Sequence, residues 1–122
     1  MGKKSRTKGR ALEQEVVRIL KAVFPDACRN LQQWARSDGR DIDDTPGWCI
    51  QVKGGKRPPW ERGYTEAAET AEDDEVALCV TRKDRGEWMA HLRLSDLVAL
   101  LEGTETRQGE APRLLVDVEE VL

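Results

Sequence analysis

The chain has 122 residues, of which 39% are hydrophobic and 35% are charged, and its formal net charge is −3. This length fits one domain, and the dense charge is typical of a small soluble protein. The net negative charge excludes the class of nucleic-acid-binding proteins that are basic overall. No apolar run approaches the roughly 20 residues of a membrane span. The basic start also lacks the apolar core of a signal peptide, so we expect a cytoplasmic protein of a bacterium or a phage-infected host cell.

The first ten residues are basic and contain no acid: they include Lys3, Lys4, Arg6, Lys8 and Arg10. We expect residues 1–7 to form a disordered basic arm, because they offer charge and little to bury, and residues 8–122 to form a single domain. Such an arm beside an acidic body is compatible with phosphate contacts to DNA, and equally with a solvated tail.

A helix is predicted over residues 8–24, which Pro25 ends. Its apolar residues recur at helical spacing: Leu12, Val16, Ile19, Leu20 and Val23. Glu13 lies one position beyond this stripe, at its border, where its carboxylate can face water or a cleft. Strands are then expected at residues 29–36, 41–44 and 48–53, with Pro46-Gly47 as the turn between the last two.

The second half begins with a basic loop of Lys56, Arg57 and two prolines that ends at Trp60. Cations beside an aromatic residue suit a phosphate-and-base surface, although Trp60 can equally pack on the following helix. That helix is expected over residues 61–72, with Tyr64, Ala67, Ala68 and Ala71 as its buried side. Strands at 76–81 and 87–94 follow, then a helix at 95–101 capped by Ser95, and a last strand or short helix at 113–122. The order predicts an α/β or α+β domain with a mixed central sheet flanked by helices.

The chain has three cysteines, Cys28, Cys49 and Cys79, without CxxC spacing, and one histidine, His91. We expect reduced cysteines and neither a zinc site nor a disulfide framework. A metal site built from several histidines is excluded.

The stretch from Asp41 to Lys53 carries the candidate chemistry. Cys49, Gln51 and Lys53 alternate with apolar residues along one expected strand, so they share a face. A carboxylate opposite an amide oxygen and an ammonium can hold a hard divalent ion next to a phosphate-neutralising cation. The same spacing also fits an ordinary hairpin with a polar outer face.

The same residues resemble the PD-(D/E)xK nucleases, and in particular the archaeal and phage Holliday junction resolvases. Lys8-Gly9 followed by Glu13-Gln14-Glu15 resembles the opening KG-x3-E-x-E of the family. Asp41 matches its metal-binding aspartate, and Gln51-Val52-Lys53 stands in the place of (D/E)-x-K. The resemblance covers about residues 8–101. Gln51 departs from it, because the family usually has an acid there.

The resemblance implies a restriction-endonuclease-like fold and hydrolysis of DNA phosphodiesters with Mg²⁺ or Mn²⁺, by a homodimer that makes paired nicks in branched DNA such as a four-way junction. It assigns Asp41, Gln51 and Glu13 to the metal and Lys53 to the attacking water or to charge on the phosphate. DNA would be held by Arg36, Lys56, Arg57, Trp60 and the basic residues of the first ten. With Gln51 neutral, Glu13, Asp43 and Asp44 are candidates to compensate.

Three other functions stay open. The chain can be a weak or inactive DNA-binding module on the nuclease fold, since Gln51 brings no charge. It can also be a flap or nicking nuclease, or a soluble α/β domain without any role in nucleic-acid binding.

Overall fold

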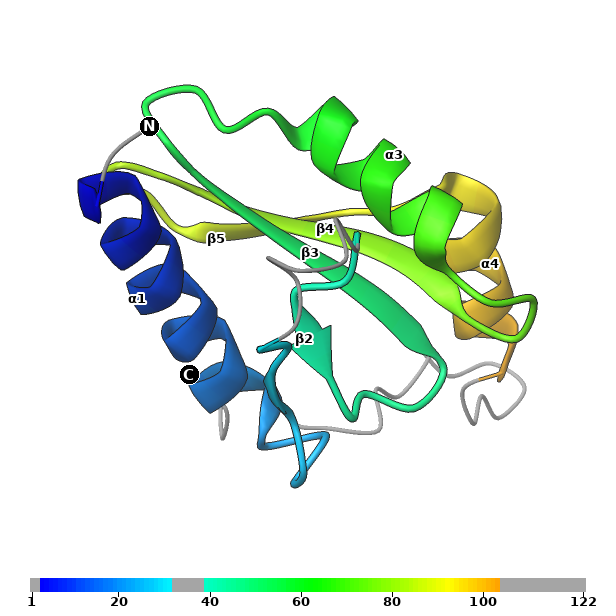
Figure 1. Cartoon of the computed structure of the whole chain (residues 1–122). Helices are drawn as coiled ribbons and strands as arrows, with labels where there is room; N and C mark the ends of the chain where they lie inside the picture. The colour runs from blue at the N-terminus through cyan, green and yellow to red at the C-terminus, as the bar shows by residue number, and fades with distance from the viewer. Residues whose placement is uncertain (1–2, 32–38, 104–122) are drawn as a thin grey trace.

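The computed structural model describes residues 3–31 and 39–103, with side chains from Lys8 onward. Its elements are the helices α1 (Lys3–Leu20), α3 (Trp60–Thr70) and α4 (Leu94–Gly103) and five strands. The strands are β1 (Cys28–Arg29), β2 (Ile42–Asp43), β3 (Trp48–Gly55), β4 (Val76–Lys83) and β5 (Trp88–His91). They form one mixed sheet in the order β1-β2-β3-β4-β5, which confirms the predicted fold class (Figure 1).

The sheet is a meander interrupted by one helical crossover. β1, β2 and β3 are antiparallel neighbours, whereas β3 and β4 run parallel and are joined by α3. Parallel neighbours need such a crossover, which explains the helix between them. β4 and β5 then form an antiparallel hairpin at the far edge.

Alternate residues of β3 pack on opposite sides of the sheet. Ile50 and Val52 join Val16 of α1 in the main hydrophobic cluster, together with half-buried side chains of α1, β4 and β5. Cys49 instead packs with Ala67 of α3 and with Ala77. The helices α1 and α3 therefore cover opposite faces of β3 (Figure 1).

α3 approaches the sheet closely at one glycine. A β-carbon at Gly63 would lie 2.5 Å from Cys79 Sγ on β4 and 2.9 Å from Lys53 Cγ on β3. Only glycine fits at this distance, so the small residues of α3 set how near the helix lies to β3 and β4. Ala67 is buried as predicted, but Ala68 is exposed.

Several element boundaries differ from those predicted. α1 begins at Lys3, so residues 3–7 are helical where a disordered arm was expected, and it ends at Leu20 because residues 21–23 form a turn. Ile19 and Val23, expected in its buried stripe, are 37% and 47% exposed.

The sheet edge also differs. β1 is only Cys28–Arg29, and the predicted continuation over residues 32–36 lies outside the described residues, as does the predicted element at 113–122. β3 extends two residues further than predicted, to Gly55, and β4 likewise continues to Lys83. Ser95 is not the residue that precedes the last helix, which already begins at Leu94.

α4 has no buried residue among the side chains described, although it is rich in leucine. Leu94 is the most exposed of its apolar residues, at 73%. In the described part of the chain, no helix is long and apolar enough to cross a membrane.

Candidate functional site

Asp41 is the residue at which β1, β2 and β3 meet. Its backbone N–H donates to the carbonyl of Ile50, and its own carbonyl accepts from the N–H of Asn30. Its side chain reaches along β3, where Oδ2 accepts the backbone N–H of Val52 at 2.8 Å. The carboxyl group therefore lies against β3 at the residue between Gln51 and Lys53, as the sequence predicted for a site.

The Asp41 carboxyl is 6% exposed and electrostatically unusual. Burial is the main cause that raises its pKa from 3.8 to about 7, and Glu13 and Glu66 add to the rise. The hydrogen bond from Val52 and the charge of Lys53 lower the pKa of Asp41, but by less than burial and the two carboxylates raise it. A buried carboxyl with a pKa near neutrality is a feature of functional sites, where a cation or a proton completes the group.

Gln51 lies beside this carboxyl on β3 and is 3% exposed. Its Oε1 atom is buried and, within the described residues, has no hydrogen-bond partner. Leaving a buried acceptor unsatisfied costs about 1–3 kcal/mol, and native structures have few such atoms. The amide oxygen is thus available to a donor or a cation that the described residues do not supply.

Lys53 follows on the same face of β3 and points toward α3. Its Nζ lies 3.1 Å from Glu66 Oε2, and its side chain is 20% exposed. Glu66 is 37% exposed and also lies 3.7 Å from Arg62, one helical turn away. The ammonium of Lys53 is therefore held at the boundary between the buried carboxyl and the surface.

Glu13 is buried, at 6% exposure, and does not lie on an open border of α1. Its Oε1 atom accepts from Arg29 Nε of β1 at 2.9 Å. The charge of Glu13 also raises the pKa of Asp41, after burial, which is the main cause.

The arrangement offers oxygen atoms from two carboxylates and one amide. The orphaned Gln51 oxygen and the neighbouring Asp41 carboxyl fit a hard cation, which prefers oxygen ligands. In residues 3–31 and 39–103, however, no three His, Cys, Asp or Glu side chains converge as a metal-holding group. A cation here would need Gln51 as a ligand.

Profiles of known protein families, curated proteins and solved structures gave no match to this chain.

The other predicted compensating carboxylates lie elsewhere. Asp44 is exposed, has a left-handed backbone with φ 60°, and accepts from the Cys28 thiol at 3.5 Å. Asp43 and Asp44 both raise the pKa of that thiol, after burial, whereas Glu13 and Glu66 raise the pKa of Asp41, also after burial. Glu13 is the carboxylate that the structure places near Asp41, together with Glu66.

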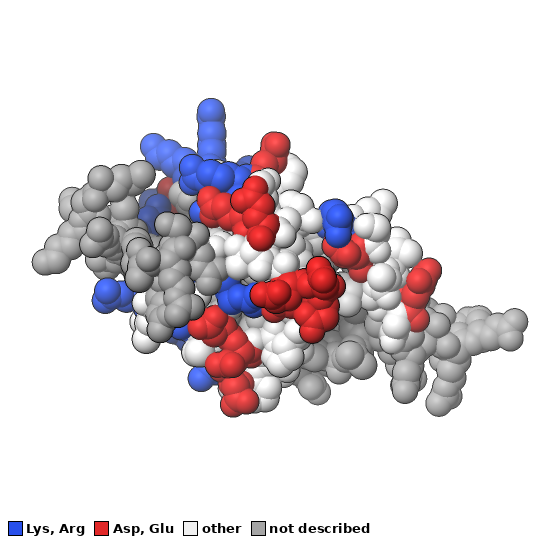
Figure 2. Space-filling model, turned by 45° about the vertical axis from the view of Figure 1, so that its right-hand side comes forward, with Lys and Arg blue, Asp and Glu red and all other residues white. Residues whose placement is uncertain are grey.

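Of the residues predicted to hold DNA, the structure describes the side chains of Lys8, Arg10, Lys56, Arg57 and Trp60. Lys8 pairs with Asp84 at 3.0 Å, while Arg10, Lys56 and Arg57 are exposed. Arg36 and the side chains of Lys3, Lys4 and Arg6 lie outside the described set. Figure 2 shows Lys and Arg gathered at one end of the face in view, with Asp and Glu in patches beside them. Trp60 begins α3 and stacks on His91 of β5, not on its own helix.

Two partners of the site were missed from the sequence. Glu66 comes from α3, and Arg29 from β1; both are charged residues in segments where nothing marks them as different from other surface charges. The signal that points to Glu66 is its place three residues after the buried Gly63 and directly before the buried Ala67, which puts it at the edge of the helix face that meets the sheet.

Proposed function

We propose that this protein is a metal-dependent endodeoxyribonuclease of the PD-(D/E)xK type that acts on branched DNA, as Holliday junction resolvases do. The observation that supports it most is the orphaned, buried oxygen of Gln51 beside a buried Asp41 carboxyl, with Lys53 two residues further along the same strand. The order of helix, three strands, crossover helix and parallel strand is compatible with the restriction-endonuclease-like fold.

Asp41, Gln51 and Glu13 would hold Mg²⁺ or Mn²⁺. Bound there, the ion supplies Lewis-acid stabilisation of the phosphate and lowers the pKa of a water. Arg29 keeps the Glu13 carboxylate in place through its hydrogen bond. Asp41 is oriented by the Val52 N–H, so its other oxygen faces away from the strand backbone.

Lys53 has an electrostatic role in this proposal. Its ammonium is paired with Glu66 and sits at the surface end of the site, where it neutralises the charge that develops on a phosphate. Two nicks on opposed strands need two sites, and one chain carries one, so a symmetric homodimer would supply both.

The decisive experiment is cleavage of a labelled four-way junction with Mg²⁺, Mn²⁺ or EDTA. We expect paired nicks that are lost with EDTA and with Asp41→Asn or Lys53→Met. Asp44→Asn and Lys21→Met are the matched controls, because they remove an exposed charge of the same kind and leave the site intact. Cleavage that survives Asp41→Asn would place the chemistry elsewhere. Flap and linear duplexes at the same salt concentration report the substrate preference.

A DNA-binding module that does not cut is the second candidate. It is favoured by the neutral Gln51 and because, among the described residues, no three His, Cys, Asp or Glu side chains are placed to hold an ion together. It predicts salt-dependent binding of the junction without product in either metal. Gln51→Glu separates the two candidates, because a gain of cleavage would identify a site that lacks one charged ligand.

A further inference from the structure

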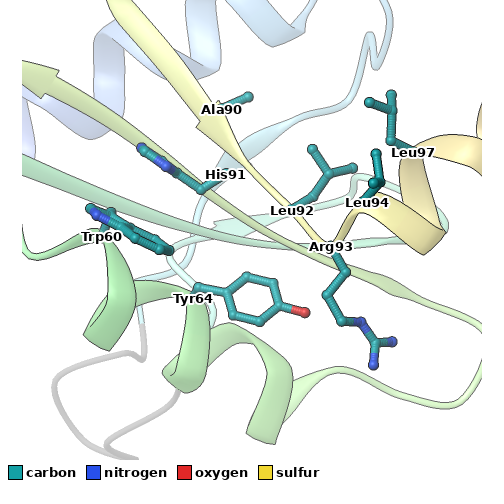
Figure 3. Close-up of a pocket in the computed structure, with 8 residues that line it drawn as sticks. All are labelled: Trp60, Tyr64, Ala90, His91, Leu92, Arg93, Leu94 and Leu97. Atoms are coloured by element: carbon teal, nitrogen blue, oxygen red, sulfur yellow. The ribbon is translucent and has the colours of Figure 1, made fainter.

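Trp60 and His91 form an aromatic pair at the surface, on the other side of α3 from Asp41. Their ring centroids lie 5.1 Å apart with an angle of 10° between the planes. His91 is fixed from behind, since its Nε2 lies 2.8 Å from the hydroxyl of Thr81. Trp60 comes from α3 and His91 from β5, and Figure 3 shows the two rings face to face. The pair is a rigid flat surface, and Trp60 is 46% exposed.

The pair separates two cavities. The one in Figure 3, about 500 Å³, is lined by Trp60, Tyr64, His91 and Arg93 together with apolar residues of the β5–α4 region. The other, about 480 Å³, is also lined by Trp60 and His91, with Pro58, Met89, Thr81 and Lys83 among its other residues. The aromatic pair thus faces both cavities, but only the second adds the hydroxyl of buried Thr81 and an exposed lysine. Both volumes lie within the range of small-ligand pockets, about 300–1,000 Å³.

This second cavity adjoins the candidate site through the strand register. Thr81, in its wall, is the direct partner of Lys53 in the β3–β4 ladder, and Met89 is the partner of Thr81 in β5. Neighbouring strands are about 4.8 Å apart, so the cavity begins about one strand spacing from Lys53. A chain of phosphates that passes Lys53 can therefore place an adjoining base in it.

The charges around the cavity suit a nucleic acid strand. Lys56 and Arg57 are exposed and directly precede Pro58, and Lys83 is exposed at the cavity itself. Glu87 is the acid in its lining. Cations that bind phosphates beside an aromatic platform that stacks bases are the combination used for single-stranded nucleic acid.

We infer that this cavity takes one unpaired nucleobase of a DNA strand, stacked on the Trp60–His91 pair, while Lys56 and Arg57 contact the flanking phosphates. The inference rests on the proposed function and adds a substrate requirement to it: unpaired nucleotides next to the phosphate that is cut. Fully paired linear DNA would leave the cavity empty.

The test is binding in EDTA, so that it does not depend on cleavage. The probe is a short single strand with one 2-aminopurine, whose fluorescence is quenched when it stacks on an aromatic ring, and a blunt duplex serves for comparison. We expect Trp60→Leu and His91→Leu to weaken single-strand binding by about 5- to 100-fold and to abolish the quenching, because each base–aromatic contact contributes on that scale. Duplex binding should not change, and Trp60→Phe should retain the quenching.

Leu94→Ala is the matched control, because Leu94 is an exposed apolar residue of the other cavity. Because Trp60 lines both cavities and Met89 only the second, quenching that disappears with Leu94→Ala and survives Met89→Ala would place the base in the Figure 3 cavity and overturn the inference. An equal loss of duplex binding in folded Trp60→Leu would do the same, since it would show a general DNA contact. If the quenching depends on Trp60 but junctions are not cut, the base site stands and the nuclease proposal fails. If Trp60→Leu leaves junction cleavage unchanged, the nuclease proposal stands and the base site fails.

Discussion

Asp41→Asn tests whether the buried carboxyl is held in an unfavourable environment. The pKa of Asp41 is raised from 3.8 to about 7. At 1.36 kcal/mol for each pKa unit, this difference corresponds to about 4 kcal/mol between the ionised and protonated forms in the folded protein. Asparagine keeps an oxygen for the Val52 N–H and removes the charge.

The direction in which stability changes with pH follows from which state of the protein binds the Asp41 proton. Between about pH 4 and pH 7 the folded protein retains the Asp41 proton, whereas the unfolded chain has released it. The contribution of Asp41 to stability is therefore complete below pH 4, is lost as the pH rises, and is gone above pH 7. Asparagine has no proton to lose, so the variant should gain up to about 4 kcal/mol relative to the unaltered protein between pH 4 and pH 8.

The assay is urea unfolding of both proteins from pH 4 to pH 9 in EDTA, because a bound cation would favour the ionised carboxylate. Any cost of burying the asparagine amide is the same at every pH and cancels in the trend. Asp44→Asn, which removes an exposed carboxyl, is the control for the substitution itself. A stability difference for Asp41→Asn that does not change with pH would refute the environment described for this carboxyl.

Four further substitutions have defined outcomes. Gln51→Leu removes the unpartnered oxygen and should stabilise the metal-free protein by about 1 kcal/mol in urea unfolding. It should also abolish any increase in melting temperature that Mg²⁺ causes. Destabilisation of the metal-free variant would mean that the amide has a structural partner. Gly63→Ala should cost about 1–3 kcal/mol, because the new methyl group would overlap the sulfur of Cys79. Gly9→Ala, in a helix and with nothing within 4 Å, should instead stabilise by about 0.5–1 kcal/mol, and calorimetry distinguishes the two. Arg40→Ala removes two hydrogen bonds, of 2.6 and 2.8 Å, to the half-buried carboxylate of Glu75 and should lower stability by about 1–3 kcal/mol. The loss should be smallest at low pH, where that carboxylate is protonated. An unchanged denaturation midpoint would contradict this expectation.

The periodicity of the chain was sufficient to predict the order of the elements. Apolar positions at helical spacing identified α1, and the alternation along β3 identified which residues share a face. The ends of the elements depend on tertiary contacts instead. β3 and β4 support each other in a parallel ladder up to Gly55 and Lys83, and no local pattern marks that length.

The candidate site was only partly predictable for a similar reason. Asp41, Gln51 and Lys53 are close in sequence and belong to one hairpin, so their proximity follows from strand geometry. The burial of Glu13 and the pairings of Arg29 with Glu13 and of Lys53 with Glu66 depend on how two helices lie against the sheet. A charged side chain on a helix has the same sequence pattern whether it faces water or a carboxylate.

The contrast between β3 and α4 has a consequence for local motion. Gln51 and Lys53 belong to the long parallel ladder with β4, whose amides can exchange with solvent only when the whole sheet opens. α4 has no buried residue in the described structure and can open at a small fraction of that free energy. Hydrogen exchange should therefore be slow around the candidate site and fast in α4. The strand that carries Gln51 and Lys53 thus keeps its spacing while the end of the described chain opens and closes.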